Sequence, residues 1–280
     1  MKVASLWQQL KTLRPSEARF LMDDALVLAW NAYARARFLR TMTPEGRALL
    51  HRNRQIQGIH RGKRCWIIGN GPSLRDMDLE LLRDEHTFAV NRFIHHPDAE
   101  LIDPKYYVIV DPNFGAGAWG TDFIEEIERR LPDVWMFTGL GGRDLLNERK
   151  LLQQHRRFVV YPNQLFSFGY PWDIDLTRGI PGMDNVTKSA LSIAVWMGFS
   201  RINLIGIDGN GLLLDQGSHF YGHVPRPQAQ RDLEKALVSS ALSMRGWRAT
   251  TDYLAARGVT LVSQNPQSVL TDLPYEPYAL

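Results

Sequence analysis

The 280-residue chain has a single cysteine, Cys65, and contains no apolar run long enough to cross a membrane. One cysteine excludes an intramolecular disulfide framework and a cysteine-based zinc site. A membrane-spanning helix needs roughly 20 consecutive apolar residues, which no part of this sequence offers. The first residues also lack the apolar stretch of a signal peptide, so we expect a cytoplasmic protein.

Low-complexity tracts and internal repeats are missing too, which excludes disordered, collagen-like and coiled-coil classes of protein. With 44% hydrophobic and 22% charged residues, the composition is typical of a globular chain that buries a core. The length predicts one large domain, or one domain with an appendage.

Acidic residues are scarce near the N-terminus. Residues 1–64, here called the basic head, contain 13 Lys and Arg against 4 Asp and Glu, although the net charge of the chain is only +3. Such a segment suits contact with an anionic membrane face or an acidic polymer, or a solvated surface whose arginines pair with the acidic body. We expect no nucleic-acid partner, and we keep peripheral contact with the inner membrane face and homo-oligomer formation as alternatives.

The pattern of apolar residues changes near residue 62. Before it, one helix is predicted from Pro15 and a second after Thr43, its N-cap, so residues 1–62 should form a basic helical appendage. Over residues 63–280, strands and helices alternate, which predicts an α/β domain with a doubly wound, mostly parallel Rossmann-like sheet. The predicted strands are 65–69, 87–91, 106–111, 134–138, 158–161, 202–207 and 259–263, and the predicted helices are 73–82, 121–131, 185–197 and 230–257.

Polar side chains follow five of the predicted strands. In a doubly wound sheet, ligands bind beyond the carboxyl ends of the strands, where the strand order reverses. Amides and small carboxylates suit sugar hydroxyls and nucleobase edges because they donate or accept hydrogen bonds in a fixed plane. Since the same residues also favour turns, their collection at one edge is the stronger argument. They are Asn70, Ser73, Asn91, Asp111, Asp208, Asn210 and Asn265.

The loop Gly69-Asn70-Gly71-Pro72-Ser73-Leu74 is the most informative of these segments. Its two glycines allow the backbone to approach a ligand, and Ser73 would cap the following helix together with Asp76. The N-terminus of that helix would then face an anion such as a phosphate. The loop has neither the third glycine of a dinucleotide fingerprint nor the Gly-Lys-Ser/Thr of a P-loop. A tight turn without a ligand is the alternative.

A second informative segment contains the sixteen residues from Asp208 to His223, between a predicted strand and a predicted helix. This glycine-rich stretch is longer than a simple connection needs, so we expect a substrate lid, with His219, Tyr221 and Arg226 as substrate contacts. A histidine that titrates near neutral pH can take a proton from an attacking hydroxyl, which makes His223 the candidate general base. Structural hydrogen bonding and metal binding are the alternatives for this histidine.

Two other segments complete the predictions. Thr187, near the start of the helix predicted over 185–197, is a further nucleotide-binding candidate. His95-His96, directly before Pro97, is predicted to form an exposed turn.

At these residues the chain resembles two related families. A strand followed by residues 69–74 is similar to the opening of the bacterial lipooligosaccharide sialyltransferases, which use CMP-activated sialic acid. The similarity covers roughly residues 64–272, and its other segments follow in the same order: Asn91, Gly206-Ile207-Asp208, 218–223 and Asn265-Pro266. The same opening marks the 6-hydroxymethylpterin diphosphokinase MptE-like proteins. The extended match, which includes Tyr106-Tyr107-Val108 and Asp111-Pro112, is closest to this second, broader group.

The resemblance implies roles for individual residues. Asn70, Ser73 and Asn91 would contact the nucleotide and Asp208 would lie near the ribose or the sugar. His223 would deprotonate the acceptor hydroxyl, which makes His223 and Asp208 the catalytic candidates. The nucleotide-binding candidates together are Gly69, Asn70, Gly71, Pro72, Ser73, Asn91, Asp111, Thr187, Asn210 and Asn265.

Three functions follow from these observations. The first is an inverting glycosyltransferase that needs no cofactor and moves a sugar, such as a CMP-activated acid sugar, to a surface polysaccharide or a lipid-linked glycan. The second is a diphosphokinase that uses ATP and Mg²⁺, with the metal between Asp111 and Asp208. The third is a non-catalytic nucleotide-binding scaffold, because Asn210 and the leucines at 212–214 stand where the sialyltransferases have tyrosines that steady the leaving phosphate.

Overall fold

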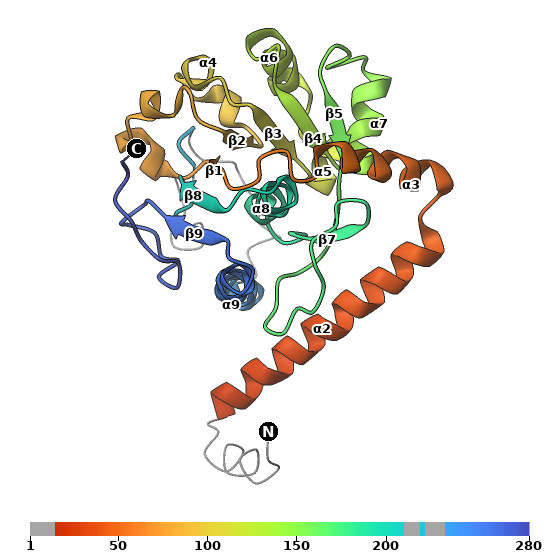
Figure 1. Cartoon of the computed structure of the whole chain (residues 1–280), viewed down its shortest axis with the longest axis vertical. Helices are drawn as coiled ribbons and strands as arrows, with labels where there is room; N and C mark the ends of the chain where they lie inside the picture. Colours follow the sequence, from red (N-terminus) through yellow and green to blue (C-terminus); the bar gives the residue numbers. More distant parts are fainter. Residues whose placement is uncertain (1–14, 210–218, 222–232, 280) are drawn as a thin grey trace.

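Seven parallel strands form one sheet in the computed structural model, which describes residues 15–209, 219–221 and 233–279 (Figure 1). Each strand lies within two residues of its predicted position, because buried parallel strands are short apolar runs between turn signals. The predicted α/β class is therefore confirmed. The strands are β1 (Arg64–Ile68), β2 (Thr87–Val90), β3 (Tyr106–Ile109), β4 (Trp135–Thr138), β5 (Arg157–Val159), β8 (Arg201–Ile205) and β9 (Thr260–Ser263).

The strand order β5-β4-β3-β2-β1-β8-β9 shows how the chain winds this sheet. The first five strands step outward from β1 to one edge. The chain then returns and places β8 on the free side of β1, with Arg64 opposite Arg201 and Ile68 opposite Ile205. The connections after β1 and β8 consequently lead to opposite sides, and ligands of doubly wound sheets bind at such a switch point.

Both faces of the sheet are covered, as apolar parallel strands require. Along β1, Cys65 and Ile67 belong to the core under α8 (Val186–Met197) and α9 (Leu233–Ala255), whereas Trp66 and Ile68 belong to the core on the other face. Figure 1 shows α8 and α9 on one side of the sheet and α4, α6 and α7 on the other. The elements on that second face are η2 (Pro72–Asp76), η3 (Leu79–Leu82), η4 (Phe93–His95), α4 (Ala99–Ile102), α5 (Pro112–Gly115), α6 (Asp122–Arg130) and α7 (Leu140–Glu148).

The buried helix α8 begins and ends where its sequence signals predict. The Asn185 side chain caps it by accepting the Thr187 N–H at 2.8 Å, and Gly198 ends it with a left-handed φ of 92°. An amide cap at the start and a glycine at the end are typical of helix boundaries. The cap fixes the first turn of α8 beside the carboxyl ends of the sheet.

The N-terminal helices are present as predicted. They are α2 (Pro15–Thr41), α3 (Pro44–His51) and the following turn η1 (Arg52–Ile56). Thr43 caps α3 by accepting the Gly46 N–H at 3.1 Å. Asn53 is fully buried and donates to two backbone carbonyls of the body, each at 2.8 Å, so this segment is tied to the rest of the chain. The division of the chain at residue 62 stays a prediction. No helix among the described residues is both long and apolar enough to span a bilayer.

In two of the ion pairs between the basic head and the rest of the chain, the head supplies the carboxylate, whereas we expected it to supply the cation. Asp24 and Glu45 supply the carboxylates, and Arg245 and Arg143 of the body supply the cations. In the part of the chain that the structure describes, only Arg64, with Glu85, pairs as a head cation with a body carboxylate. The basic charge of the head is therefore largely left for solvent or for a partner.

Several elements differ from the prediction, and three of the differences have a clear local cause. The helix expected over 73–82 consists instead of the two 3₁₀ turns η2 and η3, because Asp78 caps Glu80 and interrupts the run. A separate two-stranded sheet, β6 (Tyr161–Gln164) with β7 (Gly179–Pro181), was not predicted, since proline and glycine are depleted in strands. Helix α7 was also missed because it opens with Leu140-Gly141-Gly142, and glycine is a poor helix former.

Candidate functional site

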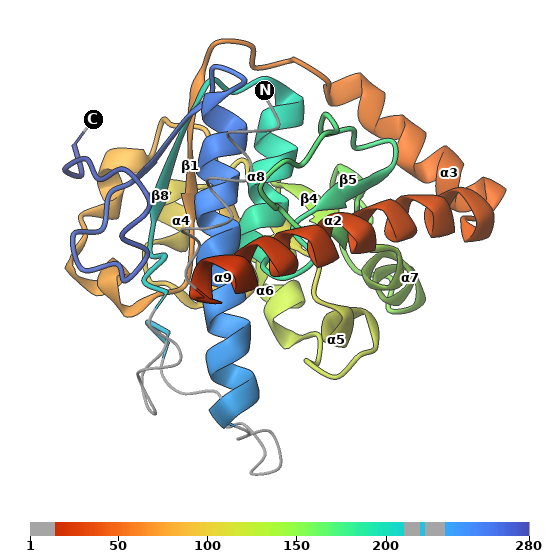
Figure 2. The same ribbon diagram turned by 90° about the horizontal axis from the view of Figure 1, so that it is seen from below.

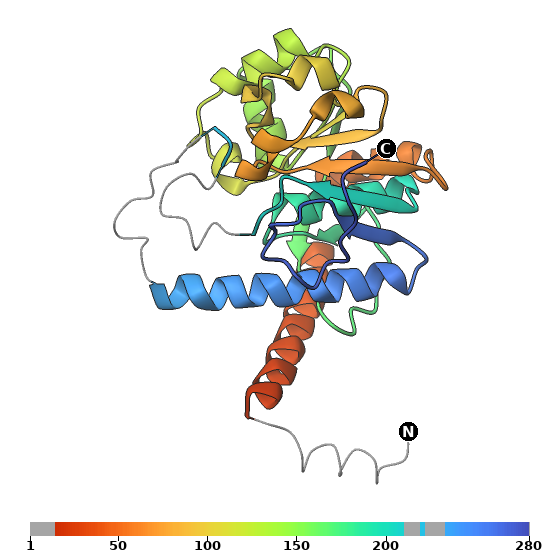
Figure 3. The same cartoon turned by 90° about the vertical axis from the view of Figure 1, so that its left-hand side faces the viewer.

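A cavity of about 960 Å³ lies beyond the carboxyl ends of β1 and β8. Its floor is made by the loops that follow these strands, residues 69–71 and 206–209, together with Asn91 after β2. Its walls come from α9, from residues 183–187 at the start of α8, and from α2, which crosses α9 on this side of the molecule (Figures 2 and 3). The cavity has the size of a small-molecule site and lies at the switch point of the sheet.

Two glycines allow the loops after β1 and β8 to touch. A Cβ on Gly69 would lie 2.2 Å from the carbonyl oxygen of Gly206, and a Cβ on Gly71 would lie 2.6 Å from the carboxylate of Asp208. Gly206 itself has a left-handed φ of 61°. The Gly71 N–H donates to the Gly206 carbonyl at 2.8 Å. The glycines of this loop are thus required by the contact between the two loops.

The carboxylate of Asp208 links the loops after β1 and β8 by hydrogen bonds. It is only 5% exposed, and its carboxylate accepts the Ser73 N–H at 3.0 Å, the Ser73 hydroxyl at 2.5 Å and the Asn265 side-chain amide at 2.7 Å. A carboxylate of the chain itself therefore occupies the donors that were expected to face a phosphate.

The expected helix cap at Ser73 is consequently wrong, whereas nucleotide binding by Ser73 stays a prediction. Ser73 bonds to Asp208 and does not cap a helix, and residues 72–76 form a single short 3₁₀ turn. A 3₁₀ turn of this length has no row of aligned peptide dipoles comparable with that of an α-helix. The charge of the nearby Asp208 would also repel an anion bound at this loop.

Two asparagines of the floor have a side-chain oxygen without a partner. Asn70 donates its amide to the Val90 carbonyl at 3.0 Å, and its Oδ1 is buried without a donor among the described residues. The Oδ1 of Asn91 is likewise buried without a donor among the described residues. Asn91 has a left-handed φ of 51°, and the Tyr107 hydroxyl fixes it by donating to its carbonyl at 2.8 Å. An unsatisfied buried acceptor costs about 1–3 kcal/mol, so a ligand hydroxyl or amino group would be stabilised here.

Three further predicted residues lie at or beside the cavity. Thr187 is buried in the first turn of α8 and lines the cavity. His219 also lines it, and its ring stacks on Tyr221 with 4.9 Å between the centroids. Burial raises the pKa of Tyr221 to about 12, so this hydroxyl stays protonated and able to donate at neutral pH.

The remaining candidates lie elsewhere. Asn265 supports Asp208, and Asp111 caps α5 by accepting the Asn113 N–H at 2.7 Å. Pro72, Asp111 and Asn265 do not belong to the cavity lining in the described part of the chain. Asn210, His223 and Arg226 lie outside the described residues.

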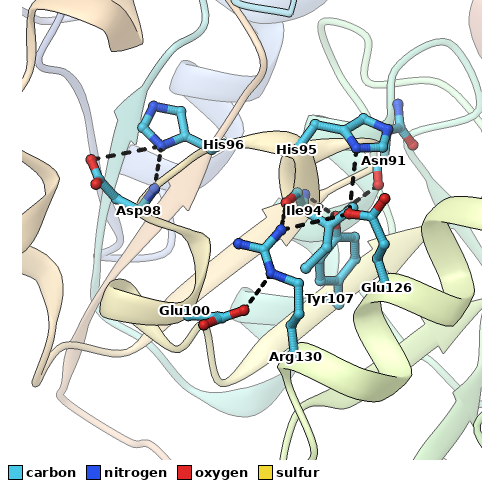
Figure 4. A network of polar contacts seen from close by, with 9 residues as sticks. All are labelled: Asn91, Ile94, His95, His96, Asp98, Glu100, Tyr107, Glu126 and Arg130. Atoms are coloured by element: carbon cyan, nitrogen blue, oxygen red, sulfur yellow. Dashed lines mark hydrogen bonds and ion pairs between the residues drawn. The ribbon is translucent and has the colours of Figure 1, made fainter.

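The segment after β2 contains a polar network that the sequence did not indicate (Figure 4). His95 lies with its Nδ1 3.7 Å from the Glu126 carboxylate of α6, and its ring meets that of Tyr221 edge-on at 6.2 Å. Arg130 of α6 donates to the Ile94 carbonyl at 2.6 Å. The predicted exposed turn is correct for His95 but wrong for His96, which is 5% exposed because its ring packs against Phe93 and Phe220. Burial lowers the pKa of His96.

The cavity wall formed by α2 and α9 was also missed. Asp24 of α2 binds Arg245 of α9 through both carboxylate oxygens, with Nε to Oδ1 at 2.9 Å. No local pattern could join these residues, because 221 positions separate them. Lys188 of α8 is fully buried and donates to Asp184 at 2.6 Å, and burial lowers its pKa. A single lysine within an apolar helix was the signal that could have indicated this buried ion pair.

The magnesium alternative requires Asp111 and Asp208 to share an ion. The strand order separates their strands by three spacings, about 14 Å at the usual distance between strands. Both Asp208 oxygens already accept hydrogen bonds, so this pair does not fit a shared Mg²⁺. Within residues 15–209, 219–221 and 233–279, no group of three or more His, Cys, Asp or Glu could hold a metal ion. Magnesium dependence stays a prediction of the diphosphokinase alternative and would need other ligands.

Comparisons with known proteins gave no sequence match: neither a family model nor a curated protein matches the chain. Among solved structures, the chain is similar to the sialyltransferase CstII from Campylobacter jejuni in complex with a substrate analogue, cytidine-5′-monophosphate. The TM-score is 0.43 with 15% identity, over 78% of this chain and 86% of that chain. A CST-II structure with a trisaccharide acceptor and CMP gives the same TM-score and identity over 77% and 86%.

A glycosyltransferase of another kind is similar over a smaller part. The MAf glycosyltransferase from Magnetospirillum magneticum AMB-1 gives a TM-score of 0.36 and 18% identity, over 54% of this chain and 24% of that chain. The matched structures thus include a sialyltransferase, the family that the sequence motifs resemble. Similarity at this level concerns the fold and says nothing about the donor or acceptor of this chain.

Proposed function

We propose that this chain is a glycosyltransferase that takes its sugar from a nucleotide-activated donor. The cavity at the switch point between β1 and β8 carries this proposal, because Asn70 and Asn91 line its floor and each has a side-chain oxygen without a hydrogen-bond donor among the described residues. The ribose hydroxyls of a nucleoside, and the amino group of a cytosine, are donors of the kind that these oxygens lack. The motif resemblance to the lipooligosaccharide sialyltransferases supports a CMP-activated acid sugar as the first donor to test.

The proposed reaction is a single displacement at the anomeric carbon. The acceptor oxygen attacks this carbon, His223 takes the hydroxyl proton, and the nucleotide phosphate leaves from the opposite side with inversion. Because η2 offers no helix N-terminus, the leaving phosphate needs another donor. His219, which lines the cavity, is the described candidate for that role. Asp208 keeps the two loops of the floor in place below the donor.

The acceptor belongs to the same proposal. We expect a surface polysaccharide or a lipid-linked glycan, as in polysaccharide biosynthesis, at the cytoplasmic face of the inner membrane. The excess of Lys and Arg in the basic head supports this location. Two head carboxylates, Asp24 and Glu45, already pair with the body, which leaves the surface of the head more basic than its composition suggests.

Thermal unfolding in the presence of nucleotides tests the donor. CMP, CDP, UDP, GDP, ADP and ATP would each be added with and without Mg²⁺, and a ligand at 100 times its Kd should stabilise the fold by about 2.7 kcal/mol. Stabilisation by CMP without metal supports the proposal, and a UDP or GDP response changes only the donor. Stabilisation by ATP alone, and only with Mg²⁺, favours the diphosphokinase. No response to any nucleotide would contradict the proposed binding site.

Three variants connect any response to the floor of the cavity. Asn91→Gly keeps the left-handed backbone and removes the unpaired oxygen, so we expect at least about tenfold weaker nucleotide binding. Asn113→Ala, at an exposed position of α5, is the matched control and should bind normally. His223→Ala should lower turnover by about 10²-fold or more with little change in nucleotide affinity, and unchanged turnover would remove this residue from the mechanism.

A further inference from the structure

Helix α2 has one face that is committed to the body. Asp24 binds Arg245, and the side chain of Asn31 both donates to and accepts from the backbone of Leu165, at 2.8 and 2.9 Å. Phe38 packs in a small core with Leu50 and Val159. The positions 24, 31 and 38 are seven residues apart, which places them on one side of the helix.

The opposite face of α2 is apolar as well. Met22, Leu26, Trp30 and Tyr33 follow one another at intervals of four, four and three residues, so they form one line along the helix, here called the apolar stripe. They are 62%, 66%, 42% and 54% exposed. Large apolar side chains that are exposed together in one patch mark an interaction surface, whereas singly scattered ones are normal.

Cations continue the apolar stripe. Arg37 and Arg40 follow Tyr33 at intervals of four and three residues, on the same line, and both are exposed. In the described part of the chain, neither arginine forms an ion pair, and the carboxylates of Asp23 and Asp24 are engaged by Arg19 and Arg245. The surface is thus apolar in its middle and positive at its end, with no exposed carboxylate over residues 18–41 of α2.

The apolar stripe lies close to the rim of the cavity. Val27, on the body side of α2, lines the cavity, and α2 crosses α9 there (Figure 2). On α9, Val238 and Leu242 line the same cavity and are 48% and 43% exposed. They lie seven and three residues before Arg245, the residue that holds α2, so the rim beside α2 is apolar on both helices.

We propose that the apolar stripe binds an anionic lipid bilayer, with Met22, Leu26, Trp30 and Tyr33 in the headgroup region and Arg37 and Arg40 on lipid phosphates. Tryptophan and tyrosine suit this region because each has an apolar ring and a polar atom. Charge complementarity favours a bilayer over a second copy of this chain, since residues 18–41 of a second α2 offer no exposed carboxylate to the arginines. The purpose of the contact rests on the proposed function: an acceptor anchored in the same bilayer would reach the cavity past its apolar rim.

Vesicle flotation of the full chain tests this surface. Phosphatidylcholine vesicles would be compared with vesicles that also contain about 30% phosphatidylglycerol, as an anionic lipid. We expect clear binding to the anionic vesicles and at least tenfold weaker binding of the double variant Leu26→Gln/Trp30→Gln, on the order expected from the loss of two inserted apolar groups. Leu39→Gln is the matched control, because Leu39 is 61% exposed on the same helix but lies off the stripe, and it should bind within about twofold of wild type.

The arginines have their own matched pair of variants. Arg37→Glu/Arg40→Glu should abolish the preference for anionic vesicles, whereas Arg52→Glu/Arg54→Glu makes the same change of charge on η1 and should keep most of it. All four residues are exposed, so the variants should fold, and their unfolding temperatures confirm this.

Several outcomes would overturn the proposal. They are a wild-type chain that binds neither kind of vesicle, a Leu26→Gln/Trp30→Gln variant that binds like wild type, and a wild-type dimer that this variant converts to a monomer without any vesicle binding. The last result would assign the stripe to a second copy. Nucleotide-induced stabilisation, measured without vesicles, keeps this proposal separate from the proposed function: vesicle binding without any nucleotide response upholds the surface and contradicts the glycosyltransferase.

Discussion

The floor and the wall of the cavity are built in different ways. At the floor, the loops after β1 and β8 approach so closely that only glycine fits at positions 69 and 71, and Asp208 closes the contact with three hydrogen bonds. At the wall, α2 meets α9 through the Asp24–Arg245 pair, and much of their surface is exposed and apolar. The floor therefore has one fixed geometry, which suits an invariant part of the ligand such as the nucleotide. The residues of the wall can change without disturbing the floor.

The largest expected effect comes from Asp208→Asn. An asparagine keeps only one acceptor oxygen and points an amide at the donors of Ser73 or Asn265, so the free energy of unfolding should fall by about 2–4 kcal/mol. Urea unfolding measures this loss. Asp111→Asn is the control, because asparagine caps a helix as well as aspartate does, and it should change the free energy by less than about 0.5 kcal/mol. Equal effects of the two variants would show that Asp208 does not hold the floor.

Gly71→Ala tests the close approach of the two loops. The new Cβ would lie 2.6 Å from the Asp208 carboxylate, so we expect a loss of about 1–3 kcal/mol together with weaker nucleotide binding. Gly139→Ala is the control, since its Cβ would have no neighbour closer than 3.9 Å and its φ is −71°. Nucleotide binding of Gly71→Ala at wild-type strength would mean that the ligand does not depend on this contact.

Arg245→Gln should affect the wall and spare the floor. Removal of the cation leaves Asp24 without its partner, which we expect to reduce the free energy of unfolding by about 1 kcal/mol. The KM for the acceptor should rise several-fold while the Kd of the nucleotide stays within about twofold. Glu45→Gln breaks a more exposed pair with Arg143, away from the cavity lining, and should change neither constant. A nucleotide Kd that rises with the acceptor KM would show that floor and wall are not independent.

The smallest effect at neutral pH should come from the opposite end of the sheet. His60 lies 2.5 Å from the Tyr106 hydroxyl and stacks on Phe199, and burial lowers its pKa to about 4, with His86 nearby as a second cause. Below its ordinary pKa of 6.5 the unfolded chain binds this proton more readily than the folded chain does, so stability should fall as the pH drops from 6.5 towards 4.

Replacement of this histidine isolates that contribution. His60→Gln cannot titrate in this range, so urea unfolding of the variant should depend less on pH between 6.5 and 4 than that of wild type. Nucleotide binding should be unchanged, because Phe199 and His86 precede β8 and β2 and the cluster lies at the amino ends of the strands. An equally steep loss of stability in the variant would assign the pH dependence to other groups.

The floor of the cavity was more predictable from sequence than the wall. Asn70, Asn91 and Asp208 could be assigned to one edge from the sequence, because each lies within three residues of the end of a buried strand and parallel strands share their carboxyl edge. The role of Ser73 could not be predicted, since its partner Asp208 lies 135 positions away and only the strand order places β8 beside β1. The apolar stripe was hidden for a related reason: α2 is apolar on two faces, and the sequence does not tell which of them meets the body.

Local sequence patterns are enough to predict the seven strands, the helices with clear caps and the set of polar residues at the carboxyl edge of the sheet. These features depend on residues that are close in the chain, such as Asn185 with Thr187 or Thr43 with Gly46. Three features could be known only from the folded chain: Asp208 bonds to Ser73, α2 completes the cavity, and the apolar stripe faces outward. Each of these depends on which distant segments pack together, and that choice is made by the whole core rather than by any local pattern.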